Sequence, residues 1–162
     1  MLVAVLPKRK PTRSDCPVSI ALEVIGDRWS LLIVRDMVVR GFSTFKQFQN
    51  SGERIATNIL ADRLLRLRRA GILTAERGAE DGRSVHYRLT QKGIDLAPTV
   101  LELLIWGARH EGSGERCAAI EQMERYRTAM LDEARRRWRE RDPRPLQVNG
   151  RWMLDGIKTQ QR

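Results

Sequence analysis

The chain has 162 residues, and 41% of them are hydrophobic, which is typical of a globular protein with one domain and its own core. Its 30 basic residues against 20 acidic ones give a formal net charge of +10, which favours nucleic acid as a partner over an anionic membrane surface or no polyanion at all. Two distant cysteines, two histidines and no run of about 18 apolar residues exclude a disulfide framework, a Cys/His metal cluster and a membrane-spanning helix.

The first predicted segments are a basic arm and two helices. Residues 1–15 are rich in lysine and arginine, contain two helix-opposing prolines and have an apolar run too short for a signal peptide, so we predict a flexible basic arm. A proline in the first turn predicts a helix from Cys16 that stops at Gly26. Its apolar residues share one face at helical spacing: Val18, Ala21, Leu22 and Ile25. A second helix is bounded by Asp27 as N-cap and Gly41 as C-terminal stop.

A short helix and a long basic helix follow. Thr44 with Gln47 three residues later predicts a capping box. The segment 53–70 predicts one long helix ended by Gly71, with five arginines against two acids. On a helical wheel, the apolar side is centred on Leu60 and the opposite side is polar or small. The residues near the apolar side are Ala56, Arg63, Leu64 and Leu67, and those opposite are Asn58, Ala61, Asp62, Leu65 and Arg69.

The second half begins with two predicted strands, over 72–77 and 84–90, where Val85, Tyr87 and Leu89 alternate with polar residues. The Asp-Gly pair between them predicts a hairpin turn. Thr90 then caps a predicted helix over 91–110, a second long helix is expected over 116–142, and an Asn-Gly pair near the end predicts a small hairpin. The fold class is therefore mainly α with a small β-hairpin wing, in the α+β sense.

The predicted order of elements is that of a winged helix-turn-helix: two helices, a short helix, a basic helix, a hairpin and a further helix. The major groove of DNA is about 12 Å wide and admits one helix, whose first residues reach the base edges. Thr57 and Asn58 lie in the predicted first turn, and asparagine can pair with adenine. We therefore predict that the helix reads the major groove of double-stranded DNA and that the hairpin clamps its neighbourhood. The predicted DNA-binding residues are Ala56, Thr57, Asn58, Ala61, Arg63, Arg66, Arg83 and His86.

Each of these residues also has an ordinary structural interpretation. Arg63 lies near the apolar side of the wheel, so a partnered structural arginine and a phosphate contact are both open. The arginines at 66, 68 and 69 would ordinarily form a solvated face. Asn58 alone would be a weak indication, and the combination of an amphipathic helix with a basic wing carries the prediction.

Three stretches resemble the HxlR-type bacterial regulators, relatives of the MarR winged-helix repressors: "CPVSIALEVIGDRWSLLIVRDMVVRG", "FKQFQNSGERIATNILADRLLRLRRAGIL" and "YRLTQKGIDLAPTVLELLIWG". The resemblance covers about residues 16–110, the predicted DNA-binding and dimerisation domain. It implies a homodimer that binds operator DNA, with the first helix and the helix around 93–108 at the interface; two recognition helices one helical turn apart would need a pseudo-palindromic site. The two distant cysteines fit a reducing cytoplasm. We expect a repressor with a candidate small-molecule or thiol-reactive effector, while the sequence leaves activation open. Residues 111–162, a helical extension with a basic tail, lie beyond the region of resemblance.

The resemblance also draws attention to Cys16, since several family members keep an N-terminal cysteine and some of these are thiol sensors. A cysteine at a helix N-terminus has its thiolate favoured by the helix dipole. Arg13 would add to this effect and Asp15 would oppose it. The alternative is an inert cysteine kept for packing.

Two other function classes compete with an operator-binding regulator. An enzyme lacks support, because the sequence has no Gly-rich phosphate loop, no paired carboxylates in a recognisable pocket and no evident partners for its two histidines. We expect no catalysis, metal or cofactor. A winged-helix protein–protein interaction module without operator binding is the closer alternative, and the basic helix and arm argue against it.

Overall fold

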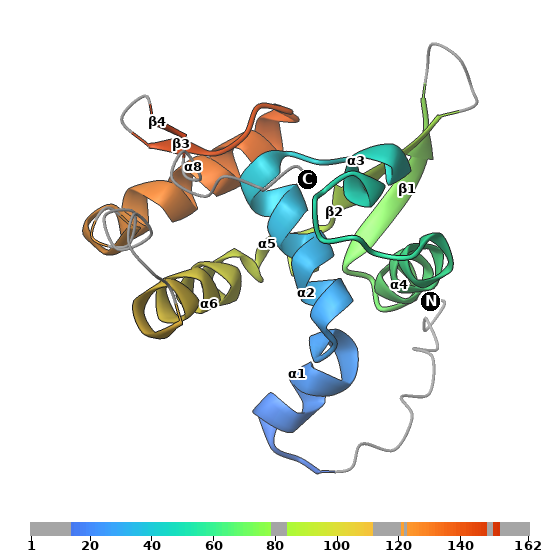
Figure 1. Cartoon of the computed structure of the whole chain (residues 1–162), viewed down its shortest axis with the longest axis horizontal. Coiled ribbons are helices and arrows are strands. Elements are labelled where there is room, and N and C mark those ends of the chain that lie inside the picture. Colours follow the sequence, from blue (N-terminus) through green and yellow to red (C-terminus); the bar gives the residue numbers. More distant parts are fainter. Residues whose placement is uncertain (1–13, 79–83, 112–120, 122, 149–150, 153–162) are drawn as a thin grey trace, which may run out of the picture.

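The structure is a computed structural model that describes residues 14–78, 84–111, 121, 123–148 and 151–152 (Figure 1). It is mainly helical with one principal hairpin, as the sequence predicts. The helices are α1 (Pro17–Ile25), α2 (Arg28–Arg35), the π-helix η1 (Asp36–Arg40), α3 (Phe45–Gln49), α4 (Thr57–Arg69), α5 (Gln91–Ile94), α6 (Ala97–His110) and α8 (Arg127–Glu140). The strands are β1 (Leu73–Arg77), β2 (Val85–Leu89), β3 (Gln147–Val148) and β4 (Arg151–Trp152). Within the described ranges, no helix is long and apolar enough to cross a membrane.

The second predicted helix divides into an α-helical and a π-helical part. Asp27 is its N-cap, as predicted, and accepts hydrogen bonds from the backbone N–H groups of Trp29 and Ser30. The chain changes to the wider π geometry at Asp36, which the expectation of one continuous α-helix missed. Asp36 is buried and pairs with Arg35 and Arg40, at 2.7 and 3.1 Å. The helix ends at Gly41, whose φ of 71° requires a residue tolerant of the left-handed region.

The helix-turn-helix pair is α3 and α4. The predicted capping box is present, with the Thr44 hydroxyl accepting from the Gln47 backbone N–H and the Gln47 side chain accepting from the Thr44 backbone. The long basic helix begins at Thr57, so the prediction that it begins at residue 53 is wrong. Arg54 has a φ of +57°, a left-handed conformation that a right-handed helix cannot include. Ala56 therefore lies at the N-cap and is exposed, not on the buried face.

The predicted hairpin is present as β1 paired antiparallel with β2, from Leu73 opposite Leu89 to Arg77 opposite Val85. The segment before α3 adds to its edge. Thr44 forms an isolated bridge with His86, and the Tyr87 backbone N–H donates to the Ser43 carbonyl oxygen at 2.6 Å. The helix pair and the wing are thus joined by backbone hydrogen bonds as well as by the chain between them.

The predicted helix over 91–110 is interrupted between α5 and α6. Thr90 caps α5 as predicted, by accepting from the Gly93 backbone N–H. Pro98 lies in the first turn of α6; proline cannot donate the backbone hydrogen bond of a continuous helix, and its ring collides with the preceding turn. The predicted helix over 116–142 is likewise broken: α8 begins at Arg127, and Tyr126 before it has non-helical backbone angles. The terminal hairpin is present as β3 paired with β4.

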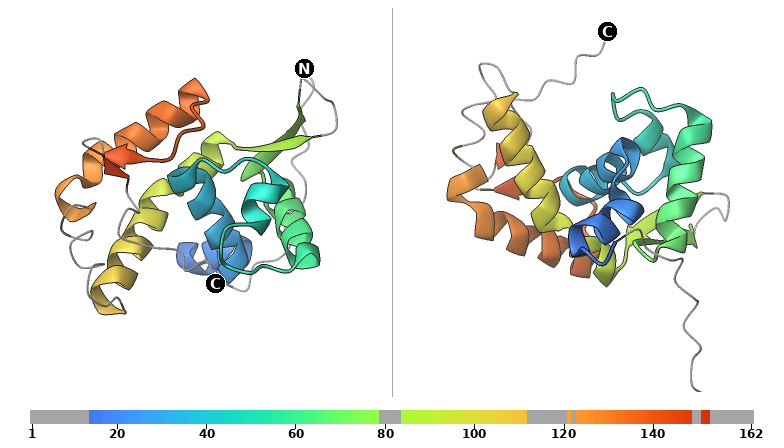
Figure 2. Two further views of the ribbon diagram at one scale, coloured as in Figure 1. Left: turned by 45° about the horizontal axis from the view of Figure 1, so that its top comes forward. Right: turned by 90° about the horizontal axis from the view of Figure 1, so that it is seen from below.

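One hydrophobic core joins these elements. It takes Leu60, Leu64 and Leu67 from α4, as the wheel predicts, and extends through α6 to Met130 and Ala134 of α8. The described part of the extension is therefore packed against the rest of the chain, and α2 lies between α4 on one side and α8 on the other (Figures 1 and 2).

The first helix contrasts with the others, because α1 projects from the body of the molecule (Figure 1). Its residues Val18 and Leu22 are 66% and 57% exposed, and only Ile25 of this helix is buried. The apolar face predicted for this helix is thus mostly turned to solvent within one chain.

Candidate nucleic-acid interface

The exposed face of α4 has the character predicted for a helix that enters the major groove. Thr57, Asn58 and Ala61 are all exposed, and Thr57 begins the helix. The Thr57 hydroxyl accepts a hydrogen bond of 3.0 Å from the side-chain amide of Gln49, the last residue of α3. This contact fixes the start of α4 against α3. The side chain of Asn58 stands next to that fixed point, within the first turn.

Arg63 is held inside the protein framework. Its Nε donates to Asp27 Oδ1 at 2.8 Å, and its guanidinium also pairs with Asp62. The hydrogen bond to Asp27 raises the pKa of Arg63. Partial burial raises the pKa of Asp27, but hydrogen bonds from Ser30 and Arg63 outweigh this and leave that pKa lowered. The structural alternative for Arg63 is therefore the one that the contacts support: it ties α4 to the N-cap of α2.

The other arginines of α4 are exposed. Arg66 pairs with Asp62 one turn earlier at 2.8 Å, with most of its side chain in solvent. Arg68 and Arg69 lie in the last turn and are also exposed. Surface pairs of this kind contribute little stability, so Arg66 can exchange its carboxylate for a phosphate at small cost.

Of the two predicted wing residues, the structure describes only His86. Arg83 lies outside the described residues, as does the predicted Asp-Gly turn. His86 is on β2, where its ring nitrogens lie 3.4 Å from the hydroxyls of Ser43 and Ser84. It lines a cleft between the hairpin and α8. The contact of His86 with DNA stays a prediction.

Cys16 is the N-cap of α1 and is exposed. The backbone N–H groups of Ser19 and Val18, in the first turn of the helix, lower the pKa of the thiol, as expected for a helix N-terminus. The thiolate is thus favoured and reachable from solvent. Among the described residues, no group of three or more His, Cys, Asp or Glu side chains could hold a metal ion.

Sequence reasoning missed the residues that position the helix. Gln49 reaches Thr57 across the turn, and Asp27 reaches Arg63 over 36 positions of sequence. The buried-side position of Arg63 on the wheel was the only signal of such a partner. Asp27 was recognised as an N-cap alone, because a carboxylate at an N-cap already has a sufficient local explanation.

Comparison with known proteins identifies relatives of the N-terminal two thirds. The HxlR-like helix-turn-helix family matches residues 24–115. The uncharacterised HTH-type transcriptional regulator YybR of Bacillus subtilis (strain 168) is 32% identical over 97 residues, which are 60% of this chain and 77% of YybR. The HTH-type regulator YdeP of the same organism, also uncharacterised, is 27% identical over 67% of this chain and 84% of YdeP.

Solved structures also share the fold. PA1607, a proposed transcription factor, is 43% identical with a TM-score of 0.56, over 61% of this chain and 68% of its own. The redox regulator HypR in its oxidised form is 30% identical with a TM-score of 0.54, over 59% of this chain and 97% of its own. The family match ends at residue 115, so α8 and the strands after it lie beyond the matched region.

Proposed function

The chain belongs to the HxlR-like helix-turn-helix family and is a transcriptional regulator of the helix-turn-helix type; from this premise we propose that it represses transcription as a homodimer bound to a pseudo-palindromic operator. The observation that carries the proposal is the exposed first turn of α4. Thr57 and Asn58 are free of the core, while Gln49 and Asp27 hold the helix that presents them. A base-reading side chain needs this combination of access and fixed position.

The surface charge of α4 supports phosphate binding next to the bases. Arg66, Arg68 and Arg69 are exposed beyond the first turn of the same helix. Arginines on phosphates fix the orientation of a protein on the duplex, and the base contacts then specify the sequence. Arg63 positions α4 through its contact with Asp27, so we do not assign it a phosphate contact.

Exposed apolar residues on two helices support the homodimer. On α1 these are Val18 and Leu22, and on α6 they are Leu103 and Trp106, which are 48% and 57% exposed. Large apolar side chains left exposed on a helix are typical of a subunit interface. A two-fold dimer would place its two α4 helices about 34 Å apart, one turn of DNA.

Cys16 gives this regulator a candidate signal input. The thiol is exposed, its pKa is lowered, and it lies at the start of the helix that we assign to the dimer interface. Oxidation or alkylation there would act on the dimer and through it on DNA. We expect Cys16→Ser to bind operator like the native chain and to stay bound when diamide is added. Release of the Cys16→Ser variant by diamide as readily as the native protein would remove the cysteine from the proposal.

The test of DNA reading is a pair of titrations. A duplex selected from a random pool and its scrambled counterpart are each titrated at several salt concentrations. We expect Asn58→Ala to cost about 1–3 kcal/mol on the selected duplex and little on the scrambled one. Gln91→Ala, which removes an exposed amide from α5, is the matched control and should change neither. An equal loss on both duplexes would show that α4 does not read sequence.

The same titrations separate the wing from the helix. If Arg83 contacts phosphate, Arg83→Ala weakens both duplexes together and lowers the slope of log K against log salt by about one. If it enters a narrow minor groove, the loss falls on the selected duplex. A protein–protein module without operator binding would show neither preference nor a salt-dependent titration in the native chain.

A further inference from the structure

A cleft of about 680 Å³ lies between the wing and the C-terminal extension. One wall is the β-hairpin face that carries Glu76, His86 and Arg88. The opposite wall is a stripe of α8, at positions 134, 137 and 138, which share one side of the helix, followed by Arg141 at its C-cap. The side wall is the end of η1 and the segment up to Ser43. Pockets for small organic molecules typically have volumes of about 300–1,000 Å³.

The extension that forms half of this cleft is firmly attached to the hairpin. Trp138 Nε1 donates to the Leu89 carbonyl oxygen at 2.7 Å. Arg88 Nη2 donates to the Trp138 carbonyl oxygen at 2.9 Å, and the Arg88 guanidinium lies 5.6 Å from the centre of the Trp138 ring system. Arg141 reaches Glu76 across the cleft at 3.4 Å. The cleft therefore has fixed walls, and they come from two parts of the chain about 50 residues apart.

The cleft carries an excess of positive charge. Its lining holds four arginines against two carboxylates, those of Glu76 and Asp142. Arg88 has no carboxylate partner within the described ranges, since its contacts are a carbonyl oxygen and an aromatic face. A half-buried guanidinium without a counter-ion attracts an anion more strongly than an exposed one does.

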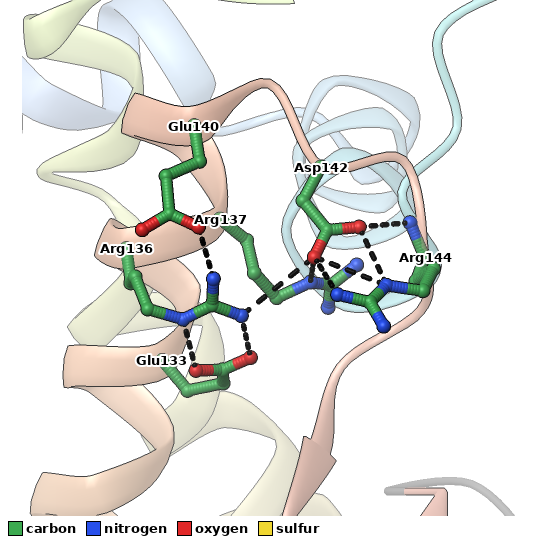
Figure 3. Close-up of polar contacts among 6 residues, drawn as sticks. All are labelled: Glu133, Arg136, Arg137, Glu140, Asp142 and Arg144. Carbon is green, nitrogen blue, oxygen red and sulfur yellow. Dashed lines mark hydrogen bonds and ion pairs between the residues drawn. The ribbon is translucent and has the colours of Figure 1, made fainter.

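Arg137 adds a second incompletely balanced cation to the lining of the cleft, and Figure 3 shows its contact with Asp142. Its side chain is 6% exposed, and its Nε lies 3.9 Å from Asp142 Oδ2. That carboxylate is bound more closely by Arg144, at 2.6 Å. Nη1 of Arg137 is buried and has no hydrogen-bond partner within the described chain, and burial lowers the pKa of this guanidinium.

Part of the remaining lining is apolar and includes aromatic rings. Met37, Phe42 and Trp138 line the cleft beside the arginines. An aromatic body can pack against such a surface while an attached anionic group meets a guanidinium. Neither a metal ion nor a long flexible polyanion would use both features.

We propose that this cleft binds a small organic anion with a planar, apolar body, whose anionic group pairs with Arg88. The site is built from α8 and therefore lies partly beyond the region matched by the family. Because one wall is the wing, occupancy also changes the affinity for DNA; only this consequence rests on the proposed function. Binding and its effect on DNA are reciprocal, since each ligand must change the affinity of the other by the same factor.

The binding test uses two probes of nearly the same shape, naphthalene-1-sulfonate and the uncharged naphthalene-1-sulfonamide, titrated into the ¹⁵N-labelled full chain. We expect the sulfonate to bind more tightly and to shift amide resonances of β1, β2 and residues 134–141. Arg88→Gln should weaken the sulfonate at least tenfold, about 1.4 kcal/mol, and the sulfonamide less than twofold. Arg88→Lys should keep most of the affinity.

The matched control is Arg139→Gln, which removes an exposed arginine of α8 that does not line the cleft. It should leave both probes unchanged. Equal affinity of the two probes, equal losses in Arg88→Gln and Arg139→Gln, or shifts confined to α1 and α6 would each overturn the site. If Arg88→Gln loses the native spectrum, Arg141→Gln replaces it, with an expected three- to tenfold loss for the sulfonate.

The effect of the ligand on DNA affinity is measured separately, on the selected duplex. Saturating sulfonate should change the duplex affinity at least fivefold in the native chain and not in Arg88→Gln. Sulfonate binding without any change in duplex affinity overturns the regulatory part. A chain that binds sulfonate through Arg88 but shows no sequence preference on DNA contradicts the proposed function and leaves the ligand site standing.

Discussion

Helices α1 and α8 flank the helix-turn-helix and use their apolar residues in opposite ways. α1 is rich in apolar residues, yet Val18 and Leu22 face solvent. α8 is rich in arginine, yet Met130 and Ala134 enter the common core and even Arg137 is 5% exposed. Hydrophobic content therefore does not decide which helix completes the fold of one chain. An apolar helix left uncovered is available to a second molecule, whereas a charged helix with one apolar stripe can be sealed by its own chain.

The largest expected effect is a loss of folding stability, and it tests how α8 packs against the core. Met130 is 2% exposed and belongs to the same core cluster as Val39 and Val100. We expect Met130→Ala to lower the free energy of unfolding by about 2–5 kcal/mol, because it leaves a cavity in a closed core. Urea denaturation measures the loss. Leu65→Ala, which truncates an exposed leucine of α4, is the control and should cost within about 0.5 kcal/mol. Equal costs would mean that α8 is only loosely attached.

The next effect tests the α1 side. Leu22→Ala should weaken the proposed homodimer by about 1–2 kcal/mol, roughly 5- to 30-fold, because it removes apolar area that a partner subunit would cover. The stability of the monomer, measured by urea at concentrations below dimer dissociation, should hardly change. Sedimentation equilibrium measures the first quantity. A monomer destabilised as strongly as by Met130→Ala would place α1 in the core of the single chain instead.

A smaller effect comes from the turn after α8, where Arg144 binds Asp142 (Figure 3). Hydrogen bonds from the Arg144 side chain and backbone hold the pKa of Asp142 well below its usual range. A depressed carboxyl pKa contributes stability above the unfolded-state pKa of about 4, and this contribution is lost as the pH falls toward the folded-state value. We therefore expect Asp142→Asn to lower Tm at pH 7 and to match the native chain more closely in strong acid. The control, Asp132→Asn on the exposed side of α8, should change Tm at pH 7 much less.

The smallest effect concerns reactivity at the start of α1 and leaves stability unchanged. Since the pKa of Cys16 is lowered, its alkylation rate should level off at a lower pH than that of the urea-unfolded chain. Iodoacetamide labelling in a Cys117→Ser background measures the rate from pH 5 to pH 10. Identical profiles for folded and unfolded chains would show that the helix N-terminus has no influence on the thiol.

Local signals in the sequence predicted most of the fold. The N-cap at Asp27, the capping box at Thr44 and the two strands of the hairpin depend on neighbours in sequence or on period-two alternation. The start of α4 was misplaced because the left-handed backbone of Arg54 leaves no mark in composition. The break before α6 was readable from Pro98 and was overlooked, since the apolar period continues across it.

The candidate site was less predictable than the fold. The wheel predicted the solvent exposure of Asn58, which it placed opposite the apolar side, but not that of Thr57. The contacts from Gln49 and Asp27 that fix the helix depend on tertiary packing. The cleft between the wing and α8 was less predictable still from the sequence. Arg88 and Trp138 have no relation in sequence, and their stacking exists only because α8 returns to the hairpin. Periodicity describes one element at a time, so it cannot indicate a space enclosed by two.

Gly41 shows how the packing of the C-terminal segment limits the substitutions that the chain can accept. At a φ of 71°, asparagine is the usual replacement for glycine. Here a Cβ atom would stand 2.3 Å from the Pro143 carbonyl oxygen, so the returning C-terminal segment forbids that replacement too. In homologues that end before this segment, the same turn should tolerate asparagine. The residue at this one position would then indicate, in an alignment, which members of the family carry a folded-back extension.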